Sequence, residues 1–186
     1  MMGKSASGKD TLYKLLLNRM PELKKVVIHT TRPKREGERE GVEYFFDSRE
    51  ALNAFREQGK IVEERTYDTV MGPWTYFTVL DGQFDSGDRD ILMIGTLESY
   101  GKMREFFGGE RMVPVYIQVD DGIRLERAVM RERLQKNPNY SEVCRRFLAD
   151  EEDFSEEKLM RLGIERRVVN QDMDQCLEEI CTMIRG

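Results

Sequence analysis

The hydrophobic and polar positions of the chain follow two different patterns, one typical of strands and one typical of helices. Short apolar or β-branched runs predict strands at Lys25–Thr30, Asp90–Ile94, Val113–Val119 and Arg166–Val169. Apolar residues spaced three or four apart predict helices at Lys9–Arg19, Arg49–Glu57, Leu97–Phe107, Gly122–Gln135, Glu142–Met160 and Met173–Ile184. This alternation is typical of an α/β fold, in which a mainly parallel sheet is covered by helices.

Two stretches differ in amino-acid composition from these predicted strands and helices. Residues 32–80 hold polar, glycine-containing loops with many aromatic side chains, and residues 120–153 form a helical segment rich in arginine. We expect both to be insertions over one end of the sheet, where open α/β sheets bind their ligands. The expected organisation is one domain over residues 1–186, with a core of residues 1–31, 81–119 and 154–186, a binding insertion at 32–80 and a helical lid at 120–153.

The composition of the chain mainly excludes classes of protein and kinds of site. The chain has 186 residues and a net charge of −5, which fits one globular domain and argues against a general nucleic-acid binder. No apolar run approaches the roughly 20 residues that span a bilayer, so we expect a cytoplasmic protein without a membrane partner. Cys144, Cys176 and Cys181 are odd in number, and we expect them to be buried apolar residues that form no disulfide framework. The single His29 leaves no Cys/His set spaced for zinc.

The first chemical motif lies at the start of the chain. Residues 3–9, GKSASGK, fit the pattern G-x-x-x-x-G-K, and a helical pattern begins directly after them. In such a phosphate loop the glycines let the backbone wrap a polyphosphate, the N–H groups and the helix N-terminus supply partial positive charge, and the lysine reaches the outer phosphates. The predicted phosphate-binding residues are Gly3, Ser5, Ala6, Ser7, Gly8, Lys9, Asp10 and Thr11.

Two details of this phosphate loop are unusual. The residue after Lys9 is Asp10, where Ser or Thr would hold Mg²⁺, so Asp10 and Thr11 are both candidate metal ligands. A phosphate loop also normally follows a buried strand, yet only Met1 and Met2 precede this one. Either the central strand is missing or the chain starts upstream of Met1. We expect the upstream start, because a sheet without that strand would leave neighbouring backbone groups unpaired.

A second motif follows at residues 30–38, TTRPKREGE, with Tyr44 further on. Arg32 and Arg35 flank a proline-fixed turn, and with the Tyr44 hydroxyl they form a set able to grip one phosphate by charge-assisted hydrogen bonds. Taken alone, this segment also fits an ordinary solvated basic loop.

Together with the phosphate loop, residues 30–46, TTRPKREGEREGVEYFF, give the chain a resemblance to guanylate kinases. The resemblance runs from Gly3 to the C-terminus. It implies a P-loop NTPase-type fold with an inserted nucleotide-monophosphate-binding subdomain and a helical lid, and it implies transfer of phosphate from ATP to GMP with Mg²⁺. It also implies that Arg32, Arg35 and Tyr44 bind the acceptor 5′-phosphate.

The resemblance implies roles for residues further along the chain. Glu63 aligns with the glutamate that recognises the Watson–Crick edge of guanine, and Tyr76 is the aromatic residue expected to touch the acceptor. Asn170, in VVNQD, aligns with a contact near the adenine of ATP. Taken alone, Glu63 also fits a surface carboxylate, and Asn170 fits a strand-ending turn.

The arginine-rich segment supplies the predicted catalytic cations Arg127, Arg131 and Arg146, which join Lys9. Phosphoryl transfer spreads negative charge over the migrating group, which lid arginines can stabilise. Arginines among glutamates also fit an exposed, salt-bridged helix, and the resemblance is what favours catalysis. Arg124, Arg133 and Arg145 are expected to be surface residues.

The chain departs from the guanylate kinase pattern at two places. Ile28 and His29 stand where the family usually has a serine that helps to bind guanine, and residues 92–96, LMIGT, replace an Asp-x-Asp near the acceptor and metal. Thr96, Glu98 and Ser99 are the candidates to take over from those carboxylates. The residues expected to bind phosphate are retained, whereas some of those expected to recognise the base are replaced. The sequence therefore supports kinase chemistry more strongly than it supports GMP as the acceptor.

The sequence therefore predicts an ATP- and Mg²⁺-dependent nucleoside monophosphate kinase that converts GMP to GDP by in-line transfer. One alternative is a related kinase acting on ribose bisphosphate, because such kinases carry Asp after the loop lysine, as Asp10 does here. The other is a non-catalytic guanylate-kinase-like module that binds peptides or phosphopeptides. The retained Lys9, Arg131 and Arg146 favour an enzyme, and the oligomeric state is left open.

Overall fold

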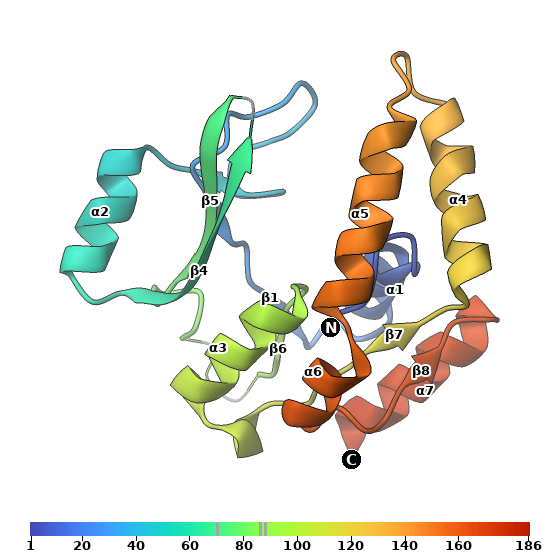
Figure 1. Ribbon diagram of the computed structural model, residues 1–186. Helices are drawn as coiled ribbons and strands as arrows, with labels where there is room; N and C mark the ends of the chain where they lie inside the picture. The colour runs from blue at the N-terminus through green and yellow to red at the C-terminus, as the bar shows by residue number, and fades with distance from the viewer. Residues whose placement is uncertain (70, 86, 88) are drawn as a thin grey trace. The chain divides into compact units, whose positions relative to one another are not determined.

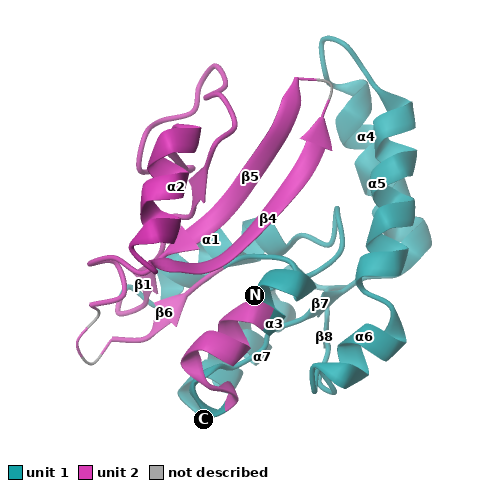
Figure 2. Ribbon diagram, turned by 60° about the vertical axis from the view of Figure 1, so that its left-hand side comes forward, with its two compact units in different colours: residues 1–21, 94–101, 110–186 teal, residues 22–93, 102–109 magenta. Residues whose placement is uncertain are grey.

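A computed structural model describes residues 1–186 except 70, 86 and 88, and it divides into two compact units (Figures 1 and 2). Unit 1 comprises residues 1–21, 94–101 and 110–186, and unit 2 comprises residues 22–93 and 102–109. The helices are α1 Lys9–Arg19, α2 Arg49–Glu57, α3 Leu97–Phe107, the 3₁₀ turn Gly109–Arg111, α4 Asp121–Arg133, α5 Tyr140–Asp153, α6 Glu156–Arg161 and α7 Met173–Arg185. The strands are β1 Lys24–Lys25, β2 His29–Thr30, β3 Phe45–Phe46, β4 Ile61–Thr69, β5 Gly72–Val79, β6 Ile91–Leu92, β7 Ile117–Gln118 and β8 Val168–Val169. The predicted α/β class is confirmed.

Unit 1 is built on short parallel strands. Met2 pairs in parallel with Tyr116, donating its N–H to Val115 O at 2.8 Å and accepting from the N–H of Ile117 at 2.9 Å. β7 pairs in parallel with β8 on its other side. The strand place ahead of the phosphate loop is therefore held by residues 1–2, and the backbone of Met2 is paired on both sides of its Cα.

Two helices of unit 1, α1 and α7, bury their apolar faces. α1 packs against α7, whose Cys176, Ile180 and Cys181 are buried. α4 and α5 lie side by side as a helical hairpin (Figure 1). Cys144 is exposed on α5, so the expectation that all three cysteines are buried is wrong for this residue. No helix in the described part of the chain is long and apolar enough to cross a membrane.

The predicted helix Glu142–Met160 is in fact two helices. α5 ends at Asp153, and a new helix, α6, begins after Ser155. Between them Phe154 leaves helical geometry and stacks on Tyr116, with ring centroids 5.6 Å apart, in a core that Leu159 and Ile164 complete. The break lets this aromatic ring enter the apolar core, which favours it.

Unit 2 contains a four-stranded sheet of order β3-β2-β5-β4 and a separate parallel pair, β1-β6. The predicted strand Lys25–Thr30 is wrong as one strand, because β1 and β2 belong to different sheets. The side chain of Gln83 takes both backbone bonds of the intervening Val27, accepting from its N–H at 2.8 Å and donating to its carbonyl at 3.1 Å. Val27 therefore has no backbone groups left for a ladder.

The long antiparallel hairpin of β4 and β5 is the largest element that the sequence did not predict. Its strands lie in the stretch that we expected to be loops. One face packs Phe77 and Val79 against Leu52 of α2, with Phe55 and Ile61 beside them. α2 itself agrees with prediction and is capped by Ser48, whose hydroxyl accepts from the N–H of Ala51 at 3.2 Å.

Candidate active site

The phosphate loop of unit 1 lies where the sequence predicts, directly before α1. Gly8 is the N-cap of α1 with φ 85°, and a Cβ there would lie 2.5 Å from Asn170 Nδ2. A Cβ on Gly3 would lie 2.7 Å from the carbonyl oxygen of Ile117. Both positions therefore require glycine, for backbone conformation in one case and for close approach in both.

The N-terminus of α1 is open to an anion. No side chain caps it, so the helix directs its first N–H groups and its positive dipole end into the loop. The Lys9 ammonium lies 3.4 Å from the carboxylate of Asp10, whose side chain is 72% exposed. Thr11 is exposed as well, so the two predicted metal ligands stand at the solvent side of the loop.

Asn170 braces the phosphate loop from β8. Its side chain is buried, and its Nδ2 donates to the carbonyl of Ser7 at 2.8 Å. Its contact with adenine stays a prediction, because in this structure the amide holds the loop backbone.

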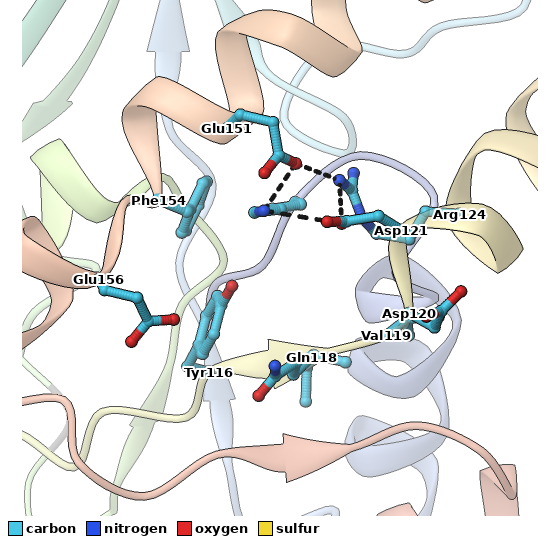
Figure 3. Close-up of a pocket in the computed structure, with 11 residues that line it drawn as sticks. Tyr116, Gln118, Val119, Asp120, Asp121, Arg124, Glu151, Phe154 and Glu156 are labelled. Carbon is cyan, nitrogen blue, oxygen red and sulfur yellow. Dashed lines mark hydrogen bonds and ion pairs between the residues drawn. The ribbon is translucent and has the colours of Figure 1, made fainter.

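Arg124 lies at the centre of a charged cluster that the sequence did not predict. We expected a surface residue, and this is wrong: Arg124 is 1% exposed. Its Nη2 donates to Asp121 at 2.6 Å and to Glu151 at 2.7 Å (Figure 3). Its guanidinium lies 4.7 Å from the ring centroid of Phe147. Carboxylates from α4 and α5 neutralise the charge, which is why this arginine can be buried.

The same cluster holds the phosphate loop at Ser5. Arg124 Nη1 donates to the Ser5 carbonyl at 3.2 Å, and the Ser5 N–H donates to Asp150 Oδ2 at 2.7 Å. Lys4 adds ion pairs to Glu151 at 2.6 Å and Asp121 at 3.6 Å. Both backbone polar groups of Ser5 are thus fixed next to Ala6, which has a left-handed φ of 61°.

A polar cavity of about 300 Å³ adjoins this cluster (Figure 3). Its lining combines Lys4 and Arg124 with the end of β7 and with acidic side chains of α4, α5 and α6. Burial alone would raise the pKa of Asp121, but the hydrogen bond from Arg124 and the charge of Lys4 outweigh it and leave that pKa below its ordinary value.

The three predicted lid arginines differ in their surroundings. Arg146 on α5 donates to the Ser5 hydroxyl at 3.4 Å, so this cation reaches the phosphate loop. Arg127 and Arg131 are exposed on α4. Their catalytic roles stay predictions.

In unit 2, one face of the four-stranded sheet collects the predicted acceptor-binding residues. A β-bulge at Val62 shifts the register of β4 between Ile61, opposite Val79, and Glu63, opposite Thr78. The bulge turns Glu63 to the face opposite Ile61, away from α2. Glu63 pairs with Thr78, and Tyr76 lies two residues from Thr78 on β5, so Tyr76 lies on this same face.

Arg32 is buried on this face and held by a carboxylate. Its two terminal nitrogens donate to Glu38 at 2.9 and 2.8 Å, and its guanidinium lies 5.2 Å from the ring centroid of Tyr44 and 5.5 Å from that of Phe46. The hydrogen bonds from Arg32 lower the pKa of Glu38 to about 2. In turn, Glu38 and a hydrogen bond to Tyr76 raise the pKa of Arg32.

Tyr44 and Tyr76 pack edge to face, with ring centroids 5.6 Å apart. Burial raises the pKa of Tyr44 above its ordinary value. The Arg35 side chain is exposed, and its backbone N–H donates to Glu38 at 2.8 Å. Arg32, Tyr44 and Tyr76 are therefore brought together, while the Arg35 guanidinium projects to solvent.

Glu63 is a buried carboxylate, not an exposed one. Its Oε1 accepts from the Thr78 hydroxyl at 2.8 Å, and its Oε2 lies 3.1 Å from Arg65 Nε. Sequence reasoning missed Arg65 and Thr78 because it did not predict β4 and β5. It missed Glu38, although a carboxylate three residues after Arg35 was visible in the motif.

The structure also places the residues at which the chain departs from the guanylate kinase pattern. His29 is buried, stacks on Phe45 at 4.8 Å and lies 2.6 Å from Asp47 through Nδ1. Thr96 and Ser99 cap α3 reciprocally, each side-chain oxygen accepting from the other's backbone N–H at 3.2 and 3.0 Å.

These features define a class of protein. A glycine-containing loop follows short parallel strands and leads into a helix whose N-terminus is uncapped. This is the arrangement of P-loop NTPase-type α/β proteins. The basic and aromatic sheet face of unit 2 adds a second set of groups suited to a phosphate ester.

Comparisons with known proteins give the family. The sequence profile of the family described as guanylate kinase matches residues 1–78. The guanylate kinase of Parasynechococcus marenigrum is 32% identical over 94% of this chain and 90% of its own length, and that of a Synechococcus species is 29% identical over 98% and 91%. The crystal structure of guanylate kinase from Anaplasma phagocytophilum shares the fold, with a TM-score of 0.68 at 22% identity over 99% of this chain and 82% of that one. The chain belongs to the guanylate kinase family of nucleoside monophosphate kinases.

Proposed function

We propose that this protein transfers the γ-phosphate of ATP to GMP, giving ADP and GDP. The observation that carries the proposal is the shared sheet face of unit 2, on which Arg32, Tyr44, Tyr76 and Glu63 lie together. This face offers a cation and hydroxyls for a phosphate monoester and a carboxylate for a base. Membership of the guanylate kinase family supports the choice of substrates.

The phosphate loop is the donor site in this proposal. The backbone of residues 3–8 and the N-terminus of α1 wrap the ATP phosphates, and Lys9 reaches the β- and γ-phosphates. Asn170 holds Ser7 in place and lies toward the adenine. The open helix end and the buried Asn170–Ser7 hydrogen bond of 2.8 Å support these roles.

The acceptor is held by Arg32, Arg35 and Tyr44 at its phosphate and by Tyr76 and Glu63 at its nucleoside. Arg32 exchanges Glu38 for the phosphate, since both partners offer two oxygens to the same nitrogens. Arg35 is free to swing inward because its side chain is exposed. The acceptor oxygen attacks the γ-phosphate in line, without a covalent enzyme intermediate.

Arg127, Arg131 and Arg146 are the cations that stabilise the migrating phosphoryl group. The 3.4 Å contact from Arg146 to the Ser5 hydroxyl supports its place beside the phosphate loop. We assign residues 120–153 as the lid and residues 32–80 as the acceptor insertion. Their closure excludes water, which would otherwise accept the phosphoryl group.

Mg²⁺ completes the proposed donor site. Among the described residues, no group of three or more His, Cys, Asp or Glu is placed to hold a metal ion. One exposed carboxylate, Asp10, with Thr11 beside it, fits Mg²⁺, which proteins commonly hold through one or two carboxylates plus substrate phosphates and water. The ion would neutralise charge on the ATP phosphates.

A coupled assay of ADP release tests the proposal with GMP, dGMP, AMP, UMP and ribose bisphosphate as acceptors. We expect turnover with GMP and a loss of at least about 100-fold in Lys9→Met, because this lysine contacts the charge that is transferred. Absence of turnover with GMP would contradict the proposal. Asp10 favours ribose bisphosphate as the second candidate acceptor, and Glu63→Gln separates the two, since only a base-bearing acceptor needs that carboxylate.

A further inference from the structure

Beside Glu63, the acceptor face carries a second buried charge, Arg65. The two residues are two positions apart on β4 and therefore point to the same face, opposite Thr78 and Tyr76 of β5. Glu63 is 2% exposed and Arg65 is 8% exposed. Arginine is seldom buried so deeply unless it is paired, and Arg65 forms an ion pair with Glu63, so this sheet face presents two opposite buried charges side by side.

The hydrogen bonding of Glu63 is half complete. Oε1 accepts from the Thr78 hydroxyl at 2.8 Å. Oε2 is buried and accepts no hydrogen bond from the described residues, although Arg65 Nε lies 3.1 Å away, because the N–H is not aligned with it. A buried carboxylate oxygen without a hydrogen bond is costly, and a ligand that brings donors would remove this cost.

A carboxylate and a guanidinium side by side present acceptors next to donors. Guanine matches this pair, because its O6 is an acceptor and its neighbouring N1–H and N2–H groups are donors. Arginine is the residue that most often donates to guanine O6 in nucleic-acid recognition, and carboxylates accept from base amino groups. Adenine carries an amino group at position 6, where an arginine donor finds no acceptor.

We propose that Arg65 is a specificity-determining residue that donates to O6 of the acceptor purine while Glu63 accepts from N1–H and N2–H. The inference rests on the proposed function and names a base contact that the phosphate-binding residues do not supply. Arg65 also keeps Glu63 charge-balanced while the base is absent. The pair thus distinguishes 6-oxopurines from 6-aminopurines.

Arg65→Met tests the proposal, because methionine keeps most of the side-chain volume and removes the donors. Calorimetric binding of GMP, of inosine monophosphate (IMP) and of AMP is measured together with kcat/KM for each. IMP keeps O6 and lacks the 2-amino group. We expect GMP and IMP affinity to fall alike by about tenfold or more and AMP to be unchanged, so that the GMP-to-AMP preference shrinks while the GMP-to-IMP ratio holds.

Three comparisons make this result specific. Glu63→Gln should narrow the GMP-to-IMP ratio, because Glu63 contacts the 2-amino group. Arg65→Lys should restore part of the GMP affinity, since lysine still donates to O6. Arg56→Met is the matched control: it removes an exposed pair with Glu64 at 2.9 Å, from the helix beside β4, and should leave all three affinities unchanged.

Contrary results would overturn the proposal in different ways. Unchanged GMP affinity in Arg65→Met would exclude a base contact, and tighter GMP binding would mean that Arg65 competes with the base for Glu63. A parallel loss of ATP affinity and thermal stability would mean a structural role. If wild-type protein neither binds nor phosphorylates GMP, the proposed function itself fails, whatever Arg65→Met does.

Discussion

Arg124 in unit 1 and Arg32 in unit 2 are both almost completely buried, and the hydrogen bonds of the two arginines are satisfied in different ways. Arg124 in unit 1 is 1% exposed, and its donors reach two helices and the Ser5 carbonyl. Arg32 in unit 2 is 3% exposed; its terminal nitrogens donate to Glu38 and to the carbonyl of Pro33, and its buried Nε has no hydrogen-bond partner among the described residues.

This difference distinguishes an arginine that holds the fold together from one that can bind a ligand. A guanidinium whose donors are all used by fixed partners holds those partners together and has nothing to offer a ligand. A guanidinium with an exchangeable carboxylate partner and an unused donor is preorganised for an anion that supplies more acceptors. We infer that Arg124 stabilises the phosphate loop, and the exchangeable partner of Arg32 fits the acceptor-phosphate role that we propose for it.

The largest expected effect that tests this comparison is on stability. Arg124→Met removes the guanidinium that joins Asp121, Asp150 and Glu151, and leaves Lys4 to pair with Asp121 and Glu151. Removing one partner of a buried ion pair costs about 3 kcal/mol, so the thermal unfolding midpoint should fall by several degrees. Arg133→Met, an exposed arginine on the same helix, is the control and should unfold like wild type. Equal midpoints in the two variants would refute the architectural role.

Arg32→Gln should show the opposite signature. GMP affinity should fall about 100-fold, because a charge-assisted bidentate contact to the phosphate is lost, while ATP affinity stays unchanged. Calorimetric titration of each nucleotide measures both. Arg39→Gln, an exposed arginine of the same segment, is the control. A loss of ATP and GMP affinity together would show that Arg32 is structural, like Arg124.

The sequence predicts some of this in detail and some not at all. α1, α2 and α3 agree with prediction at both ends, because apolar periodicity and the Ser48 cap are local signals. β4 and β5 were missed because the side of the hairpin opposite α2 is charged and polar and the bulge at Val62 interrupts the alternation that identifies a strand. The residues that we propose to bind the acceptor are therefore the ones that hide the strand pattern.

The candidate site shows the same limit. The phosphate loop and the arginine motif are contiguous in sequence, so Gly3, Gly8, Arg32 and Tyr44 could be found without a structure. The role of Arg124 could not, since its partners Asp150 and Glu151 lie 26 and 27 residues further on. Nothing local distinguishes one arginine in a charged helix from its neighbours until the fold sets which of them faces inward.

A change of pH should weaken the Arg32–Glu38 pair in a defined window. The pKa of Glu38 is lowered to about 2 in the folded protein from an ordinary value of 4.5, so the pair contributes its full stability above about pH 4.5 and loses it as the pH falls toward 2. Wild type should therefore be more stable than Glu38→Gln by a few degrees at pH 7, and the two midpoints should converge between pH 4.5 and 2. Thermal unfolding at several pH values measures this. A constant difference down to pH 2 would mean that the carboxylate charge contributes nothing.

The smallest effect is expected at a pair with the same geometry as one in the Arg124 cluster. Arg145 Nη2 lies 2.7 Å from Glu142, the distance that also joins Arg124 to Glu151. The Arg145 side chain is 67% exposed, however, so water already solvates both charges and Arg145→Ala should change stability by less than about 0.5 kcal/mol. Urea unfolding measures the loss of stability in this variant and in Arg124→Met. Because the two contacts have the same length, any difference between the two losses comes from burial and from the number of fixed partners. If both variants were destabilised equally, contact distance would decide the energy of these pairs, and the distinction between a saturated and an exchangeable arginine would lose its physical basis.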